Sequence, residues 1–257
     1  MTLPRIATFL LGVLLLASAA CRGTVFRPAN FKDNRALFDA SVKELERRNW
    51  DNAVAGFERL TLELPARDPL MTLSLFYLGK AHEGKKENLL AAQSYTRIVE
   101  GFPDDTLADD GLLLAGRAYA RLWRRPDLDA QYGETALSTF QTMLALFPSS
   151  PLKAEAEKEV ARLNQWFATK LYENGMHYFG RKAYDSAIIY FTDVGKLYPD
   201  TPRARDALIR LAQAYDRIRY RDDASETCAK LRQTYPGDRE VAEVCGVVPR
   251  TAASSTP

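Results

Sequence analysis

The stretch that decides the fold is residues 183–202, AYDSAIIYFTDVGKLYPDTP. In it a small residue, Ala187, is followed by an aromatic residue, Phe191, and then by a proline, Pro199. The same order and spacing recur in four other places: Ala53, Phe57, Pro65; Ala91, Tyr95, Pro103; Ala136, Phe140, Pro148; and Ala224, Cys228, Pro236. Because proline has no N–H with which to continue a helix, each unit is predicted to be one helix that ends at its proline.

A second apolar helix is predicted upstream of these units. Its marker residues are Leu78, Gly79, His82; Ala115, Gly116, Tyr119; Asn174, Gly175, Tyr178; and Leu211, Ala212, Tyr215. Together the two helices resemble the tetratricopeptide (TPR) pattern W-x2-L-G-x2-Y…A-x3-F…P. We therefore predict an all-α fold, a TPR solenoid of five helical hairpins. Its repeats are expected at about 34–65, 70–103, 107–148, 152–199 and 203–236. The first repeat matches the pattern poorly, as is typical of a terminal cap, because Ala40, Ser41 and Glu44 take the pattern positions.

Two insertions interrupt the period. Residues 123–134 lengthen the loop inside the third repeat, and residues 152–169 are expected to join the fourth repeat as one long helix. Insertions in solenoids often lie on partner-binding surfaces, although tolerated growth of the chain is the alternative. Helices are expected to restart at Asp68, Ser150 and Thr201, each of which precedes a proline and could act as the N-cap.

The two ends of the chain have a different character from the repeats. Residues 1–20 resemble a secretory signal peptide, with an apolar run shorter than the roughly 20 residues of a spanning helix. Cys21 follows Ser18-Ala19-Ala20, which resembles a lipobox, so we expect an acylated Cys21 and a tether over 21–33. The alternative is ordinary signal cleavage that releases a soluble periplasmic protein. The repeat domain is then 34–246, and the small, polar tail 247–257 is expected to be disordered.

Composition argues against several classes of function. The formal net charge of +2 argues against nucleic acid as a partner, which needs a concentrated basic face. The two histidines, His82 and His177, fall at or beside positions where aromatic residues pack, so core packing is predicted for both. His82 lacks the second histidine of a zinc motif, so no metal or other cofactor is implied. No nucleophile or phosphate-binding motif is present, and we predict that the protein is not an enzyme.

Cys228 and Cys245 form an even pair once Cys21 is lipidated, in an oxidising compartment. They lie at nearly equal distances from the Pro236-Gly237 turn. A short capping helix after this turn would bring the two sulfurs together, and a disulfide would then fasten the C-terminal cap. The alternative is two free, buried thiols that act as small hydrophobic residues.

A groove is expected on the first helix of each hairpin, one turn away from the packing positions. The residues assigned to it are Phe38 and Val42; Phe76 and Lys80; Leu113 and Arg117; Tyr172 and Met176; and Ile209 and Gln213. Apolar side chains next to Lys80 and Arg117 suit a peptide with an apolar anchor and a carboxylate. The alternative for Phe38 and Phe76 is a place in the core.

Two stretches carry a resemblance to a known family: 197–218, LYPDTPRARDALIRLAQAYDRI, and 178–191, YFGRKAYDSAIIYF. With the expected lipidated cysteine, a repeat period longer than the usual 34 residues and the expected long helix, they resemble the BamD family, the TPR lipoproteins of the outer-membrane β-barrel assembly machinery. The resemblance covers residues 34–240. The chain departs from the family pattern at Ser18 of the lipobox, and its Cys228 and Cys245 are not required by the family.

The resemblance implies a non-enzymatic scaffold anchored on the periplasmic face of the outer membrane. The C-terminal repeats would dock on the periplasmic domains of the barrel-forming subunit, and other assembly lipoproteins are candidate partners. The N-terminal repeats would receive unfolded barrel precursors through their C-terminal signal. The residues assigned to these contacts are Phe38, Phe76, Lys80, Arg117, Tyr172, Arg203, Arg205, Asp206 and Arg217. The alternative is another periplasmic TPR lipoprotein, such as a pilotin-like secretin chaperone or a coordinator of envelope constriction.

Overall fold

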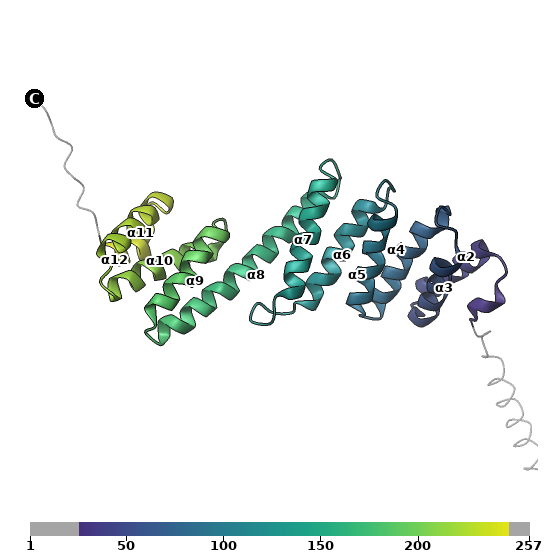
Figure 1. Ribbon diagram of the computed structural model, residues 1–257, viewed down its shortest axis with the longest axis horizontal. Coiled ribbons are helices and arrows are strands. Elements are labelled where there is room, and N and C mark those ends of the chain that lie inside the picture. Colours follow the sequence, from purple (N-terminus) through teal and green to yellow (C-terminus); the bar gives the residue numbers. More distant parts are fainter. Residues whose placement is uncertain (1–25, 247–257) are drawn as a thin grey trace, which may run out of the picture. The chain divides into compact units, whose positions relative to one another are not determined.

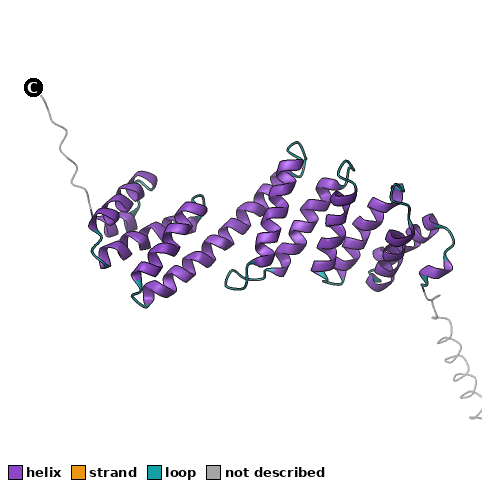
Figure 2. Ribbon diagram, in the orientation of Figure 1, coloured by secondary structure: helices purple, strands orange, loops and turns teal. Residues whose placement is uncertain are grey.

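The computed structural model describes residues 26–246. The expected signal peptide, Cys21 and the tail 247–257 lie outside this range. Every regular element within it is helical (Figure 2). The elements are η1 (Pro28–Asn30), α2 (Asn34–Glu46), α3 (Trp50–Glu63), α4 (Pro69–Gly84), α5 (Asn88–Gly101), α6 (Ala108–Leu122), α7 (Gln131–Leu146), α8 (Lys153–Gly180), α9 (Tyr184–Leu197), α10 (Pro202–Arg217), α11 (Arg221–Thr234) and α12 (Arg239–Cys245). The predicted all-α class is confirmed.

The helices form two compact units, divided between Ser94 and Tyr95 within α5. In the first unit α2 packs on α3 and α3 packs on α4. In the second unit the hairpins α6–α7, α8–α9 and α10–α11 follow one another, and α12 packs on both α10 and α11 (Figure 1). These helices contact their neighbours in sequence within each unit, as expected for a repeat array.

Small residues let the two helices of a hairpin approach closely. A Cβ atom added to Gly116 would lie 2.6 Å from the ring of Phe140, and one added to Gly175 would lie 2.6 Å from the ring of Phe191. Both rings are fully buried. The glycine and the aromatic residue of the sequence pattern therefore form one contact, and no larger residue fits at the glycine without displacing the ring.

Of the three predicted N-cap residues, Asp68 and Thr201 directly precede their helices and Ser150 does not. The side chain of Asp68 accepts a hydrogen bond from the Leu70 amide at 2.8 Å and caps α4. The hydroxyl of Ser150 accepts one from the Leu152 amide at 3.0 Å, in a turn that ends before α8 begins. Thr201 is the N-cap residue of α10 and Pro202 is its first residue, as predicted, but the Thr201 side chain makes no capping hydrogen bond. Its hydroxyl donates to the carbonyl of Tyr198, which follows the last residue of α9.

Four turns inside hairpins end their first helix in the same way, with a basic residue at positive φ. These residues are Arg48 (61°), Lys86 (63°), Lys182 (62°) and Arg219 (64°). The next amide reaches back to the helix, as when Tyr220 donates to the Tyr215 carbonyl at 2.9 Å. This is the Schellman motif, in which glycine usually takes the left-handed position. A basic side chain there lies next to the negative end of the helix dipole, which offsets part of the conformational cost.

The two insertions are visible in the second unit. Helix α8 runs without a break over 28 residues, which confirms the predicted long helix. The loop between α6 and α7 lies against it, because Lys170 of α8 donates to the Leu128 carbonyl at 2.7 Å. Trp123, at the start of this loop, is 1% exposed and packs on Phe167 of α8 with ring centroids 4.6 Å apart. The loop is therefore anchored to the core by Trp123, although most of the residues after it are exposed.

Candidate functional site

The predicted groove residues of the first unit fall into two environments. Phe38 is only 7% exposed and packs edge-on against Phe57 and Tyr77, with centroids 5.8 Å away in both cases. Phe38 is therefore a core residue, which was the alternative prediction for it. Phe76 is half-buried, and the ammonium group of Lys80 lies 4.5 Å from its ring centroid. Phe76 and Lys80 thus remain as a partly exposed pair of an apolar and a charged side chain.

Arg117, in the second unit, is already bound to two carboxylates. Its guanidinium contacts Glu155 at 2.6 Å and Glu159 at 3.3 Å, both on α8. Burial disfavours the charge of Arg117, but the hydrogen bonds to these two carboxylates outweigh it and raise its pKa above the usual value. Arg117, which was expected to bind a carboxylate of a partner, therefore forms ion pairs that link α6 to α8.

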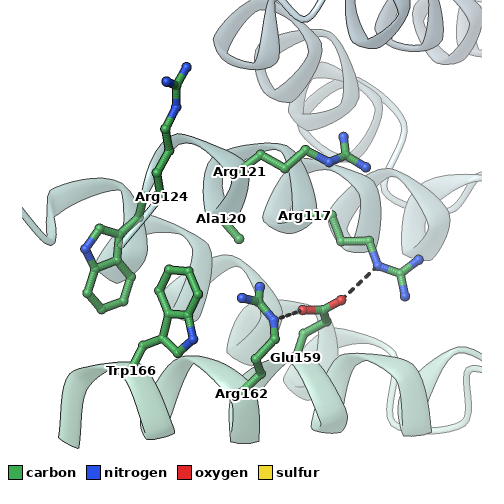
Figure 3. Close-up of a pocket in the computed structure, with 8 residues that line it drawn as sticks. Arg117, Ala120, Arg121, Arg124, Glu159, Arg162 and Trp166 are labelled. Atoms are coloured by element: carbon green, nitrogen blue, oxygen red, sulfur yellow. Dashed lines mark hydrogen bonds and ion pairs between the residues drawn. The ribbon is translucent and has the colours of Figure 1, made fainter. Parts of the chain in front are cut away.

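Around Arg117 lies a cavity of about 610 Å³ between α6 and α8 (Figure 3). We call it the arginine cleft, and its lining residues are Arg117, Ala120, Arg121, Trp123, Arg124, Glu159, Arg162 and Trp166. Arg162 contacts Glu159 at 2.8 Å, and its guanidinium carbon lies 5.5 Å from the Trp166 ring centroid. Except for Arg117, none of these residues was predicted from the sequence to belong to a site. The feature of the sequence that could have identified them is the helical spacing of Arg117, Arg121 and Arg124, and of Arg162 and Trp166.

The residues assigned to docking lie at the start and end of α10. Arg203 stacks on Tyr172 of α8, with its guanidinium carbon 4.7 Å from the ring centroid, and contacts Asp206 at 3.2 Å. Arg205 turns toward α12 and binds Asp238 at 2.7 Å and Glu240 at 3.1 Å. Arg217 is exposed at the end of α10. Arg203 and Arg217 are therefore more accessible to a partner than Arg205.

Asp238 is the centre of the ion pairs that hold α12. One of its oxygens accepts from the amides of Glu240 at 2.9 Å and Val241 at 3.1 Å, so it is also the N-cap of α12. Hydrogen bonds from Arg205, reinforced by those from the backbone, lower the pKa of Asp238 to about 2. The same contact raises the pKa of Arg205. Both groups are thus charged at neutral pH.

The cysteine pair occupies the same cap. Cys228 and Cys245 form a disulfide that joins α11 to α12, with Cα atoms 5.5 Å apart. Val241, between the ion pairs and the disulfide, is 2% exposed and belongs to the core. Arg232 donates a hydrogen bond to the Cys245 carbonyl at the end of α12. A covalent bond, ion pairs and a buried side chain therefore all fasten one short helix.

The histidines differ from one another. His82 is 4% exposed and its Nδ1 lies 2.8 Å from Glu87, as expected for a core histidine with a hydrogen-bond partner. His177 is exposed on α8, and the prediction that it packs in the core is wrong. A residue next to a packing position on a helix points toward a different face. The packing position here is Tyr178, whose ring stacks on the ring of Tyr190. Residues 26–246 contain no cluster of side chains suited to a metal ion.

Stacked helical hairpins in which a small residue of the first helix packs on an aromatic residue of the second define a tetratricopeptide-repeat protein. The model of the YfiO family, described as outer membrane lipoprotein, matches residues 31–231, and the chain belongs to this family. It is therefore a non-enzymatic scaffold associated with the outer membrane. Within the residues that the structure describes, no helix combines the length and the apolar character needed to cross a membrane.

Individual relatives agree with the family. The outer membrane protein assembly factor BamD of Caulobacter vibrioides is 25% identical over 239 residues, which cover 91% of this chain and 78% of that protein. The BamD protein of Vibrio cholerae is 24% identical over 212 residues, covering 78% of this chain and 86% of that one. A solved tetratricopeptide repeat protein from Parabacteroides merdae is 18% identical, with a TM-score of 0.37, over 82% of this chain and 70% of that chain.

Proposed function

We propose that this chain is a scaffold lipoprotein of the complex that assembles β-barrel proteins in the outer membrane. The observation that carries the proposal is the family match over residues 31–231, together with relatives that are named outer membrane protein assembly factors. In this proposal Cys21 carries the lipid that anchors the protein to the periplasmic face of the membrane. Replacement of Cys21 by alanine should abolish labelling with fatty acid, and unchanged membrane retention of that variant would contradict the lipid anchor.

The barrel-forming subunit is the proposed partner of the C-terminal repeats. Arg203 and Arg217 are exposed enough to contact it, and Tyr172 lies beside Arg203, whereas Arg205 and Asp206 would act by keeping α10 and α12 in place. An affinity tag on the chain in its native host should retrieve this subunit as the main partner. A secretin, or a protein of the constriction machinery, as the main partner would favour the alternative TPR lipoproteins.

Charge reversal separates docking from folding. The variants Arg203→Glu and Arg217→Glu should retrieve less of the barrel-forming subunit, because each places a carboxylate where a cation meets the partner. Arg239→Glu is the matched control, since Arg239 is 93% exposed on α12 and outside the proposed surface. Equal recovery with all three variants would contradict docking through α10.

Unfolded barrel precursors are the proposed partners of the N-terminal repeats. Phe76 and Lys80 offer an apolar surface and a cation for a C-terminal peptide that ends in an aromatic residue and a carboxylate. Phe38 would support this surface from the core, whereas Arg117, bound to Glu155 and Glu159, would act by holding α6 to α8. The double variant Phe76→Ala, Lys80→Glu should weaken binding of a labelled C-terminal barrel peptide. Unchanged binding would show that the peptide does not use these residues.

A further inference from the structure

A second cavity of the second unit lies where α9 and α11 flank α10. Both helices pack on α10 (Figure 1), and the three together enclose a volume of about 290 Å³. From α10 the cavity is lined by the apolar side chains of Leu208 and Leu211 and by Tyr215, and from α9 it is lined by Gly195. We call this cavity and its charged rim the Gly195 groove.

The fold does not require a glycine at position 195. Gly195 lies in the last turn of α9, and its φ is not in the left-handed region. A Cβ atom added to it would lie 3.5 Å from the Leu208 side chain, which is an ordinary van der Waals distance, whereas one added to Gly175 would clash with a ring. Glycine also weakens a helix relative to alanine. Neither the backbone nor the packing of the hairpin therefore accounts for Gly195.

The first three repeats have a side chain at the matching position, four residues after the aromatic residue of the pattern. The residues there are Thr61, Val99 and Leu144. Thr61 is buried, and Val99 and Leu144 are partly buried against the core. In the fourth repeat the glycine leaves this place without a side chain, and the groove lies there.

The rim of the groove carries opposite charges at its two ends. Short connections join α9 and α11 to α10, so both helices run antiparallel to α10 and parallel to each other. Lys196 and Lys230 lie in the C-terminal halves of their helices. Asp223 and Glu226 lie in the N-terminal half of α11, and their charges, after burial, raise the pKa of Tyr215. All four charged side chains are exposed and form no ion pair within residues 26–246.

We propose that the Gly195 groove binds an amphipathic helix of another protein, with one apolar side chain of that helix in the cavity beside Gly195. A basic residue on one side of this anchor would meet Asp223, and an acidic residue on the other side would meet Lys230. These two residues are seven positions apart on α11, or about 10.5 Å along its axis, which is about two turns. The partner's two charges would thus each lie about one turn from its anchor. The missing side chain at Gly195 lets the partner backbone approach closely.

A helix with both charges fits the groove better than an anion does. A phosphate or an anionic headgroup would meet the carboxylates of Asp223 and Glu226 as well as the two lysines, and like charges repel. The volume of about 290 Å³ is at the lower end of the range for ligand sites, about 300–1,000 Å³, so it suits a side chain better than a cofactor. The inference rests on the groove alone and does not depend on the proposed role in barrel assembly.

Fluorescence anisotropy with the full mature chain tests the proposal. The probe is a labelled, alanine-rich helical peptide of about 18 residues with glutamate, leucine and lysine on one face, each one turn from the next. One counterpart has alanine in place of the leucine, and the other has glutamine in place of both charged residues. The probe should bind at least about tenfold more tightly than either counterpart. Equal binding of the three peptides would overturn the proposal.

Replacement of the glycine separates binding from folding. Gly195→Leu introduces the residue of the third repeat and should weaken the probe at least about tenfold, while the melting temperature stays the same or rises, because leucine favours a helix more than glycine does. Gly180→Leu is the matched control, since a side chain at Gly180 would meet no atom within 4 Å, and it should bind as the original protein does. Gly195→Ala, which adds only the tolerated Cβ, should weaken binding by a smaller factor and serves if the leucine variant does not fold. Unchanged affinity in a folded Gly195→Leu or Gly195→Ala variant would overturn the proposal.

Charge reversal tests the lysine end of the groove. The double variant Lys196→Glu, Lys230→Glu should bind the probe about tenfold more weakly, and a peptide with lysine in place of the glutamate should restore the affinity. Neither lysine forms an ion pair within the described residues, so the variant should keep the native circular dichroism. Equal affinity of the variant for the two peptides would overturn the proposal.

Discussion

The fourth and fifth repeats of the second unit occupy the same pattern position with different chemistry. In the fourth repeat the position is Phe191, which is fully buried against Gly175 and packs near the rings of Tyr172 and Phe179. In the fifth repeat it is Cys228, which has no ring to fill the space and forms a disulfide with Cys245 of α12. At this position the fourth repeat is stabilised by side-chain packing, and the fifth repeat by a covalent bond.

The difference follows from what lies beyond each repeat. Helix α10 packs on both α8 and α9, so the fourth hairpin buries its face against the fifth. Among the residues that the structure describes, the last hairpin has only α12, a helix of seven residues, to cover its exposed face. A helix this short is not stable by itself in water, so it needs fixed links to the rest of the fold. The disulfide and the Arg205–Asp238 ion pair provide them.

The largest effect should come from removing the ring of the fourth repeat. Phe191→Ala leaves a cavity in a fully buried site, and we expect the free energy of unfolding to fall by about 3–5 kcal/mol. Guanidinium denaturation followed by circular dichroism measures this change. The control is Ile189→Ala on the same helix, where the side chain is 61% exposed and the loss should stay within about 0.5 kcal/mol. Similar losses in the two variants would contradict closure by packing.

The second effect concerns the disulfide. Its cysteines are 17 residues apart, and a loop of this length predicts a loss of about 3 kcal/mol when both are replaced by alanine. Addition of a thiol reductant should bring the original protein close to the stability of the variant and leave the variant unchanged. Peptide mapping without reduction should find Cys228 linked to Cys245. Two free thiols in that map would contradict a covalent cap.

The third effect is the pH dependence of the cap. The folded pKa of Asp238, about 2, is below its ordinary value of 3.8, so its contribution to stability is present above about pH 4 and is lost as the pH falls toward 2. The melting temperature of Asp238→Asn should therefore be lower than that of the original protein at pH 7. This difference should shrink between about pH 4 and pH 2.

A neighbouring carboxylate provides the control for this pH dependence. Glu243 lies on the same helix, and its side chain is 63% exposed in a surface ion pair with Arg239. Surface ion pairs contribute little to stability, so Glu243→Gln should show no comparable change over the same pH range. A constant difference between Asp238→Asn and the original protein down to pH 2 would mean that the Asp238 carboxylate does not hold the cap.

The sequence predicted the pairing of helices well because that pairing depends on local spacing. The small residue, aromatic and proline identify a hairpin wherever they occur, and the long α8 follows from the lack of a helix breaker before Gly175. Contacts between residues that are far apart in the chain have no comparable pattern in the sequence. Nothing in the sequence shows that Arg205 binds Asp238, 33 residues away, or that Tyr77 covers Phe38.

The arginine cleft was missed for a related reason. Its two walls, on α6 and α8, are separated in the chain by the whole of α7 and the loop before it, so their helical spacings were visible but not their closeness. Arg117 was assigned correctly to the first helix of its hairpin. Its two partners on α8 could be identified only once the long helix was placed against α6.

The smallest effect should come from the turns that the two repeats share. Lys182 in the fourth repeat and Arg219 in the fifth both have positive φ, which costs a residue with a Cβ about 1–2 kcal/mol. Glycine removes this cost but loses more entropy on folding, about 0.5–1 kcal/mol, and it removes a cation from the helix end. We therefore expect Lys182→Gly and Arg219→Gly each to stabilise the protein by less than about 1 kcal/mol, by similar amounts, in urea denaturation. Because the turns are alike while the cores differ, a large difference between the two variants would show that the cap also constrains the turn of the fifth repeat.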